Sequence, residues 1–156
     1  MTPPLGSSMM AAMVDRTKPY PVIDEDNRAF WEGAQRHELI IKRCGDCGFY
    51  IHYPKPFCPK CWSENVQPTQ VSGRGRVFSF NIVRQQLAPG IPPPYVVALV
   101  SLEEQESVRL ICNIVECPPE AVSIGMPVEV TFQDEDEELT IPQFKPAPPA
   151  QAERAT

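Results

Sequence analysis

The chain has 156 residues, and its 20 Asp and Glu residues outnumber 14 Lys and Arg residues, giving a formal net charge of −6. Because affinity for a phosphate backbone depends on clustered Lys and Arg, this balance disfavours a general nucleic-acid binder. The length allows one ordinary domain or two small modules that share a core. No apolar run approaches the roughly 20 residues that cross a bilayer, so we expect a cytoplasmic protein.

Proline is concentrated towards both ends of the chain, which holds 19 prolines in all. Segments of this composition favour extended backbone and resist packing into a core. We therefore expect residues 1–23 and 146–156 to be flexible tails that flank the folded part.

The first predicted element is a helix over residues 24–37, with a lead-in strand that begins before residue 40. Asp24 or Asp26 can cap the helix, and Arg36 and His37 suit its end. Its apolar stripe contains Phe30 and Trp31, two aromatic side chains that suit either packing or docking to a partner subunit.

Two Cys-x-x-Cys pairs follow, Cys44 with Cys47 and Cys58 with Cys61, within a predicted zinc ribbon over residues 41–70. Two such knuckles bring four thiolates to one tetrahedral site, and four protein ligands leave no open position for substrate. A pair of redox dithiols would need a thioredoxin-like βαβ context, which is absent. We predict a structural metal, with His52 in a surface or stacking role, although the spacing does not distinguish zinc from iron.

The remaining cysteines carry no catalytic signature. Cys112 falls in a predicted strand and is expected to be a buried, small apolar residue, and Cys117 is expected to be a loop thiol.

Residues 71–145 change to short runs of β-branched and aromatic residues separated by Gly and Pro. Five such runs with no crossing helix predict a small antiparallel barrel, for which an OB-fold is the best match, while an SH3-like barrel or half-sandwich remains open. In the first run, Phe78, Phe80 and Ile82 alternate with Val77 and other residues as one half-buried face. The predicted strands cover residues 76–84, 95–102, 107–115, 128–132 and 138–144.

The connections between these strands differ in character. Residues 103–107 predict a polar hairpin turn, Gly125 a turn before the next strand, residues 72–76 a bend, and residues 134–138 a solvated acidic turn. The segment 85–94 contains four prolines and is semi-rigid and apolar. We expect it to contact a partner or ligand, through Pro92, Pro93 and Tyr95, rather than only protect a strand edge.

These residues together resemble a known family. The order is Phe30-Trp31-Glu32, "RCGDCG", "CPKCW", "SGRGRVFSF", "PPYVVALVSLEE", "RLICNIV", "IGMPVEVTF" and "PQFKPA". It resembles the acyl-CoA-associated family with a rubredoxin-like zinc ribbon and an OB-fold, long described as a domain of unknown function. The resemblance extends from about Phe30 to Ala147.

The resemblance implies a non-catalytic subunit that accompanies a thiolase-like enzyme of the lipid-transfer-protein type and helps form the path of a CoA thioester. The leading hypothesis is a subunit of a retro-aldolase that cleaves steroid or lipid side chains. The segment "YPKPF" departs from the family's usual Pro-Pro-Arg, because Lys55 stands in that neighbourhood and lacks a guanidinium fork. Arginines on or beside the predicted strands are candidates to contact CoA, together with Lys55: Arg74, Arg76, Arg84 and Arg109.

The sequence allows three alternative functions to different degrees. One is a subunit of an acyl-CoA hydratase or of an acetoacetyl-CoA-forming thiolase and synthase complex. Another is a single-stranded nucleic-acid-binding module, since zinc ribbons and OB-folds both serve that purpose. An independent hydrolase or hydratase is disfavoured, because the chain has two His, neither of which lies in an acid–base motif.

Overall fold

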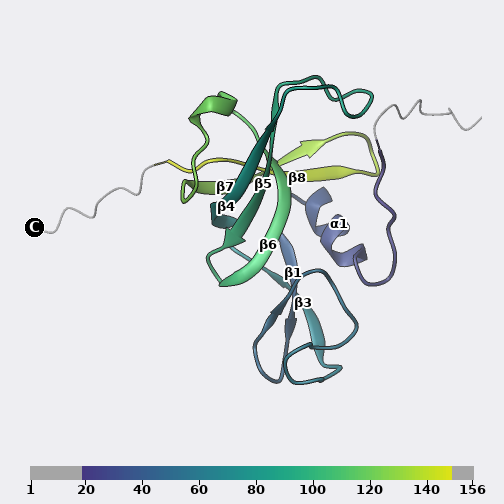
Figure 1. The fold of residues 1–156 in the computed structure, drawn as a ribbon. Coiled ribbons are helices and arrows are strands. Elements are labelled where there is room, and N and C mark those ends of the chain that lie inside the picture. The colour runs from purple at the N-terminus through teal and green to yellow at the C-terminus, as the bar shows by residue number, and fades with distance from the viewer. Residues whose placement is uncertain (1–18, 149–156) are drawn as a thin grey trace, which may run out of the picture.

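The computed structural model describes residues 19–148, and Figure 1 shows their arrangement. The predicted tails therefore lie largely outside the described residues. The described part holds one α-helix, a three-stranded sheet and a closed five-stranded barrel, which confirms the predicted fold class. No helix in residues 19–148 is long and apolar enough to cross a membrane.

Helix α1 (Arg28–Gln35) is shorter at both ends than the sequence predicted. Its N-cap is Asn27, which makes no side-chain capping hydrogen bond. The side chain of Asp24 instead accepts hydrogen bonds from the backbone N–H groups of Asp26, at 3.0 Å, and Asn27, at 2.9 Å. The predicted capping role of Asp24 and Asp26 is therefore wrong, because Asp24 closes the turn that precedes the helix. At the other end, His37 has a φ of 58°, which lies outside the helical range.

The ribbon is built on strands β1 (Ile40–Cys44), β2 (Tyr50–Ile51) and β3 (Val66–Gln70), in the order β2-β1-β3 with antiparallel pairing. The sequence predicted β1 but not β3. Pro68 lacks a backbone N–H and so removes one hydrogen-bond donor from β3. The sequence of the strand, "VQPTQ", shows little alternation of apolar and polar residues. Such a strand is tolerated because it lies at the edge of the sheet, where Pro does not break a ladder on both sides.

All five predicted barrel strands are present. They close in the order β4-β5-β6-β8-β7. β6 meets β8 in parallel through the register pair Ile114 and Phe144, and Phe144 is fully buried. Helix α1 lies beside β8 and β1 in Figure 1, next to this seam. The strands are β4 (Arg74–Val83), β5 (Tyr95–Leu102), β6 (Gln105–Ile114), β7 (Pro127–Asp134) and β8 (Thr140–Pro146).

The predicted face of the first barrel strand is wrong at two residues, Val77 and Phe78. Val77 is 1% exposed and belongs to the core, whereas Phe78 is 43% exposed. The register of β4 against β5 shifts between Val77 and Ser79. A bulge of this kind adds one residue to one strand and moves the following side chains to the opposite face. Phe80 and Ile82, beyond the bulge, pack partly buried against the core as predicted.

The turns described here lie where the sequence predicted them. Glu103 and Glu104 join β5 to β6, and Gly125, with a φ of 83°, precedes β7. Gly73, with a φ of 76°, lies in the bend that admits the chain to β4. The positive φ at both glycines is a conformation that side chains with a Cβ disfavour.

The ribbon and the barrel are joined by a side-chain bridge. The carboxamide of Gln105, on β6, accepts the backbone N–H of Tyr50 at 2.9 Å and donates to the backbone carbonyl of Tyr50 at 3.0 Å. Leu39 and Ile41 of the ribbon side also belong to the same buried cluster as the barrel residues. The two modules therefore share a core, as the length of the chain allowed.

Candidate functional site

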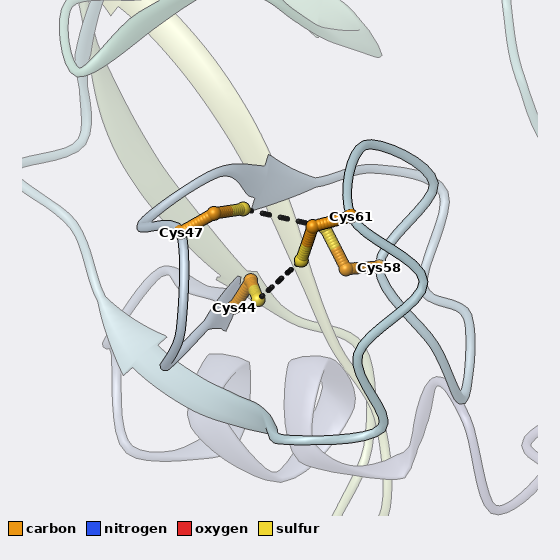
Figure 2. Close-up of side chains that lie close together, drawn as sticks. All are labelled: Cys44, Cys47, Cys58 and Cys61. Atoms are coloured by element: carbon orange, nitrogen blue, oxygen red, sulfur yellow. Dashed lines mark hydrogen bonds between the residues drawn. The ribbon is translucent and has the colours of Figure 1, made fainter.

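The four predicted ligands converge on one point. The Sγ atoms of Cys44, Cys47, Cys58 and Cys61 all lie within 4.8 Å of one another, and Figure 2 shows the side chains turned inward from the two knuckles. Cys44 lies 3.6 Å from Cys61, and Cys47 lies 3.6 Å from Cys58, measured between Sγ atoms. A tetrahedron with metal–sulfur bonds of about 2.3 Å has edges of about 3.8 Å. The cluster therefore fits a tetrahedral four-thiolate metal site.

The thiols of this cluster influence one another's ionisation. The backbone N–H of Cys47 is the largest influence on Cys44 and lowers its pKa to about 6. At Cys61 the N–H of Ser63 acts in the same direction, but burial and the neighbouring thiols outweigh it and raise the pKa to about 12. Crowded thiols resist losing a second proton unless a cation neutralises the charge. The arrangement therefore favours a bound metal ion over free thiols.

Polar contacts tie the two knuckles together outside the cluster. Asp46, in the first knuckle, accepts hydrogen bonds from the Ser63 hydroxyl and, at 3.0 Å, from the Asn65 side-chain amide. These two hydrogen bonds hold the pKa of Asp46 below its usual value, and the bond from Ser63 has the larger effect. These hydrogen bonds therefore hold the two knuckles together independently of a metal ion.

The structure brings two of the four predicted arginines into one row. Arg76 on β4 and Arg109 on β6 both lie opposite Ser101 of β5, on the outer face of the sheet. The guanidinium of Arg109 lies 3.7 Å from the ring centroid of Phe78. Arg76 is exposed and donates to the carbonyl of Gly125 at 3.1 Å.

The other predicted cations are dispersed. Arg74 is paired with Glu103 at 3.1 Å, and Arg84 with Glu120 at 3.5 Å near the opposite end of β4. Lys55 is exposed, and its backbone carbonyl accepts a hydrogen bond from Lys42 at 3.2 Å. The five predicted CoA contacts therefore do not form one cluster.

The predicted partner-binding residues also divide into two groups. Phe30 and Trp31 lie on α1 with their rings in edge contact at 5.1 Å between centroids. Pro92 is exposed, while Pro93 and Tyr95 are half-buried, at the base of a loop that projects from the barrel in Figure 1. Both groups remain predictions of partner contact.

A pocket that the sequence reasoning missed lies at the junction of α1, the ribbon and the barrel. It has a volume of about 400 Å³ and is lined by Phe30 and Trp31 together with Leu110, Ile111 and His52, among others. The imidazole of His52 contacts the ring of Tyr53 at 4.4 Å between centroids, but the two rings are tilted by 33° and do not stack, so the predicted surface or stacking role of His52 stays a prediction. The paired aromatics of α1 were the sequence signal for this site, but its walls come from segments as far apart in the chain as Asp24 and Phe144, which local patterns could not join.

The two cysteines outside the ribbon are not activated. Cys112 is 9% exposed, and its burial raises its pKa to about 12. Cys117 is half-buried, and burial raises its pKa too. Neither thiol is prepared to act as a nucleophile at neutral pH.

Comparison with known proteins shows similarity in both modules. The ChsH2 rubredoxin-like zinc ribbon domain matches residues 31–67, and the ChsH2 C-terminal OB-fold domain matches residues 68–133. A chain of the solved Ltp2-ChsH2(DUF35) aldolase superposes with a TM-score of 0.77 at 39% identity, covering 83% of this chain and 100% of that chain.

Two relatives show the breadth of this similarity. The probable enoyl-CoA hydratase alpha subunit of Thermomonospora curvata is 39% identical over 132 residues, which are 85% of this chain and 41% of that protein. The chain thus spans about two fifths of that relative's length. A DUF35 domain-containing scaffold protein of Methanocaldococcus jannaschii is 37% identical over 103 residues, 64% of this chain and 70% of that protein. The chain belongs to the DUF35 family of proteins with a ChsH2-type zinc ribbon and OB-fold.

Proposed function

We propose that this chain is the non-catalytic subunit of a thiolase-like enzyme that acts on CoA thioesters, and that the enzyme is a retro-aldolase. The observation that carries the proposal is the likeness to the chain of the Ltp2-ChsH2(DUF35) aldolase, which this chain covers from end to end. The aldolase pairing, the steroid or lipid substrate and the partner itself come from that relative and from the family resemblance. The catalytic groups would lie on the partner.

The metal in this proposal is zinc, held by the four cysteines. Four thiolates on a d¹⁰ ion without redox chemistry form a closed structural site. The donor set and the 3.6 Å sulfur separations support this choice. The ion would fix the ribbon, and thereby the edge of the barrel to which Gln105 attaches it.

The row of Arg76 and Arg109 is the part of the surface best suited to a CoA thioester. CoA combines phosphates with a long, mainly apolar arm, so a few cations beside apolar surface suit it better than a uniformly basic face. Arg109 lies over Phe78, and Ile111, two residues further along β6, is 63% exposed. Leu99 lies opposite Ile111 on β5. The outer face of β4, β5 and β6 therefore offers cations for the phosphates and apolar side chains for the arm of CoA.

The test is co-expression with the thiolase-like protein encoded beside this chain. We expect one complex on gel filtration, and an enzyme that loses CoA-thioester cleavage when this chain is omitted. Separate elution, with a fully active enzyme alone, would contradict the accessory role.

Arginine variants of the complex then test the CoA surface. We expect Arg76→Ala and Arg109→Ala to raise the KM for the CoA thioester by about tenfold, as loss of a charged hydrogen bond would, with little change in kcat. Arg84→Ala is the matched control, because Arg84 is exposed and paired with Glu120 at the other end of β4. A KM unchanged in all three variants would place the CoA path elsewhere.

The hydratase alpha subunit of Thermomonospora curvata supports a second candidate, in which the partner hydrates an enoyl-CoA instead. Assaying the purified complex with both an enoyl-CoA and a β-hydroxyacyl-CoA distinguishes the two reactions by their products.

A further inference from the structure

The pocket beside α1 is enclosed by three separate parts of the fold. Helix α1 contributes Phe30 and Trp31, the segment after β2 contributes His52, and the barrel contributes residues of β6 and β8.

The barrel leaves this space open because of its seam. β6 and β8 pair through Ile114 and Phe144, whereas the pocket is lined by residues of both strands that precede this pair, such as Leu110 and Ile141. Helix α1 covers the gap, and the rings of Phe30 and Trp31, which meet edge-on at 88°, line the space that remains. The result is a hollow of about 400 Å³ with mainly apolar walls, within the range of small-molecule sites.

His52 lines the pocket, and one nitrogen of its ring has no partner among the described residues. The Nδ1 atom of His52 is buried and makes no hydrogen bond with any described residue. Burial lowers the pKa of His52 to about 4, so the imidazole is neutral at physiological pH. A neutral imidazole offers one donor and one acceptor but does not attract an anion.

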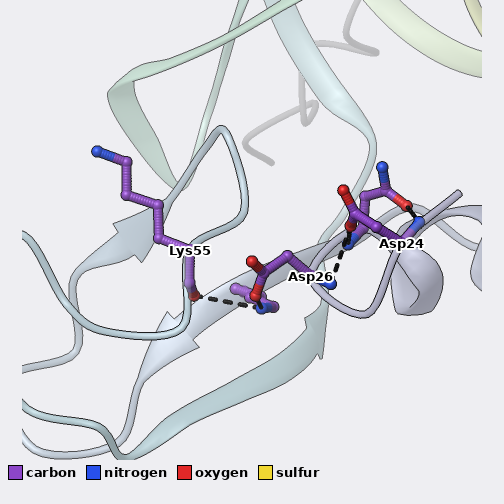
Figure 3. A network of polar contacts seen from close by, with 5 residues as sticks. Asp24, Asp26 and Lys55 are labelled. Carbon is purple, nitrogen blue, oxygen red and sulfur yellow. Dashed lines mark hydrogen bonds and ion pairs between the residues drawn. The ribbon is translucent and has the colours of Figure 1, made fainter. Parts of the chain in front are cut away.

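The charges around the pocket are acidic. Asp24 and Asp26 belong to its lining, and no Lys or Arg does among the described residues. Lys42, the cation paired with the lining residue Asp26 at 2.9 Å, also donates to the backbone carbonyl of Lys55 at 3.2 Å. Figure 3 shows the Lys55 side chain extending away from Asp26 and Asp24. An anionic ligand would therefore meet carboxylates without a compensating cation.

We propose that this pocket binds an uncharged, mainly apolar small molecule that presents one polar atom to His52. Apolar walls supply most of the affinity, and the acidic lining excludes phosphates, carboxylates and sulfonates. The pocket adjoins the arginine row, because Ile111 lines it and lies two residues beyond Arg109 on β6, but its occupancy does not depend on the proposed partner enzyme.

Two dyes that share one skeleton provide the test. N-phenyl-1-naphthylamine is neutral, and 8-anilinonaphthalene-1-sulfonate adds a sulfonate to the same rings. The full-length, metal-loaded chain is used with Trp62→Phe, because the chain has two Trp and Trp62 is 73% exposed. We expect the neutral dye to saturate at one site and to quench Trp31, and the sulfonate to bind at least about tenfold more weakly, as an unpaired charge would.

A matched pair of variants locates the site. Ile111 and Ile124 are both exposed, at 63% and 72%, but Ile111 lines this pocket and Ile124 does not. We expect Ile111→Asp to weaken binding of the neutral dye by about tenfold through lost apolar contact and added charge, and Ile124→Asp to leave it unchanged. Circular dichroism and metal content establish that both variants are folded.

Three results would overturn the proposal. The first is no saturable binding of the neutral dye to a folded, metal-loaded chain. The second is a sulfonate affinity equal to or tighter than that of the neutral dye. The third is that the neutral dye binds elsewhere, which an equal effect of Ile111→Asp and Ile124→Asp or the absence of Trp31 quenching would show.

Discussion

Gly73 lies where an added Cβ atom would collide with one neighbouring side chain. It has a φ of 76°, and a Cβ built on it would collide with Cγ1 of Val130 on β7. The Val130 N–H donates to the Gly73 carbonyl at 2.8 Å, so the backbone cannot move away without losing this bond. We therefore predict that Gly73→Ala strongly destabilises the barrel.

The magnitude follows from two contributions. Left-handed backbone costs a residue with a Cβ about 1–2 kcal/mol, and overpacking against a neighbouring side chain costs about 1–3 kcal/mol. The expected loss in the free energy of unfolding is therefore about 2–5 kcal/mol, a large share of the stability of a typical domain. Gly125 is the matched control, because its φ is 83° but no atom lies within 4 Å of its built Cβ. Gly125→Ala should lose only the backbone contribution, about 1–2 kcal/mol.

Urea unfolding of the metal-saturated protein measures these differences. Val130→Ala removes the opposing methyl groups, so Gly73→Ala should cost about as little in that background as Gly125→Ala costs in the wild type. The coupling between the two positions should amount to about 1–3 kcal/mol. If Gly73→Ala is as mild as Gly125→Ala, or if Val130→Ala does not relieve it, steric conflict at this bend is not what requires glycine.

Three further predictions concern the metal, the contact between His37 and Asp134, and the core. Cys58→Ser should reduce bound zinc well below one ion per chain by elemental analysis, because Cys58 is fully buried in the cluster, whereas Cys112→Ser should retain it. The pKa of Asp134 is lowered by hydrogen bonds from Thr140 and then His37. Asp134→Asn should therefore be less stable than wild type above pH 3.8, the ordinary carboxyl pKa, and the difference should vanish as the pH falls through the lowered native value; equal stabilities at neutral pH would contradict this. Phe144→Ala should cost about 3–5 kcal/mol in urea unfolding, against about 0.5–1 kcal/mol for Phe78→Ala, which mainly loses its cation–π contact.

The barrel was predictable because alternation in its strands reflects burial directly. Tyr95–Leu102 alternates half-buried and buried residues throughout, and each exposed or buried position can be assigned from local sequence. The exception was Phe78, where the bulge between Val77 and Ser79 displaced the pattern by one residue. A bulge depends on the partner strand's register, which the sequence of β4 alone does not specify.

The metal cluster and the pocket differ in how local their determinants are. The four cysteines lie within a stretch of 18 consecutive residues, 44–61, and their spacing reflects the geometry of two knuckles. The pocket brings His52 of the ribbon against Ile111 of β6 and Ile141 of β8, through a packing of modules that no periodicity encodes. The predicted arginines illustrate the same limit, since Arg76 and Arg109 share a row only because both strands pair with β5.

The double hydrogen bond from Gln105 to Tyr50 has a consequence for how the molecule comes apart. A carboxamide that both accepts from and donates to one residue's backbone imitates a neighbouring strand, so it occupies an edge of the ribbon sheet that another chain could otherwise extend. Since Gln105 begins β6, disorder that starts at a demetallated ribbon would reach the β5–β6 hairpin first. Amide protons of that hairpin should then exchange with solvent sooner than those of β7, which lies across the barrel.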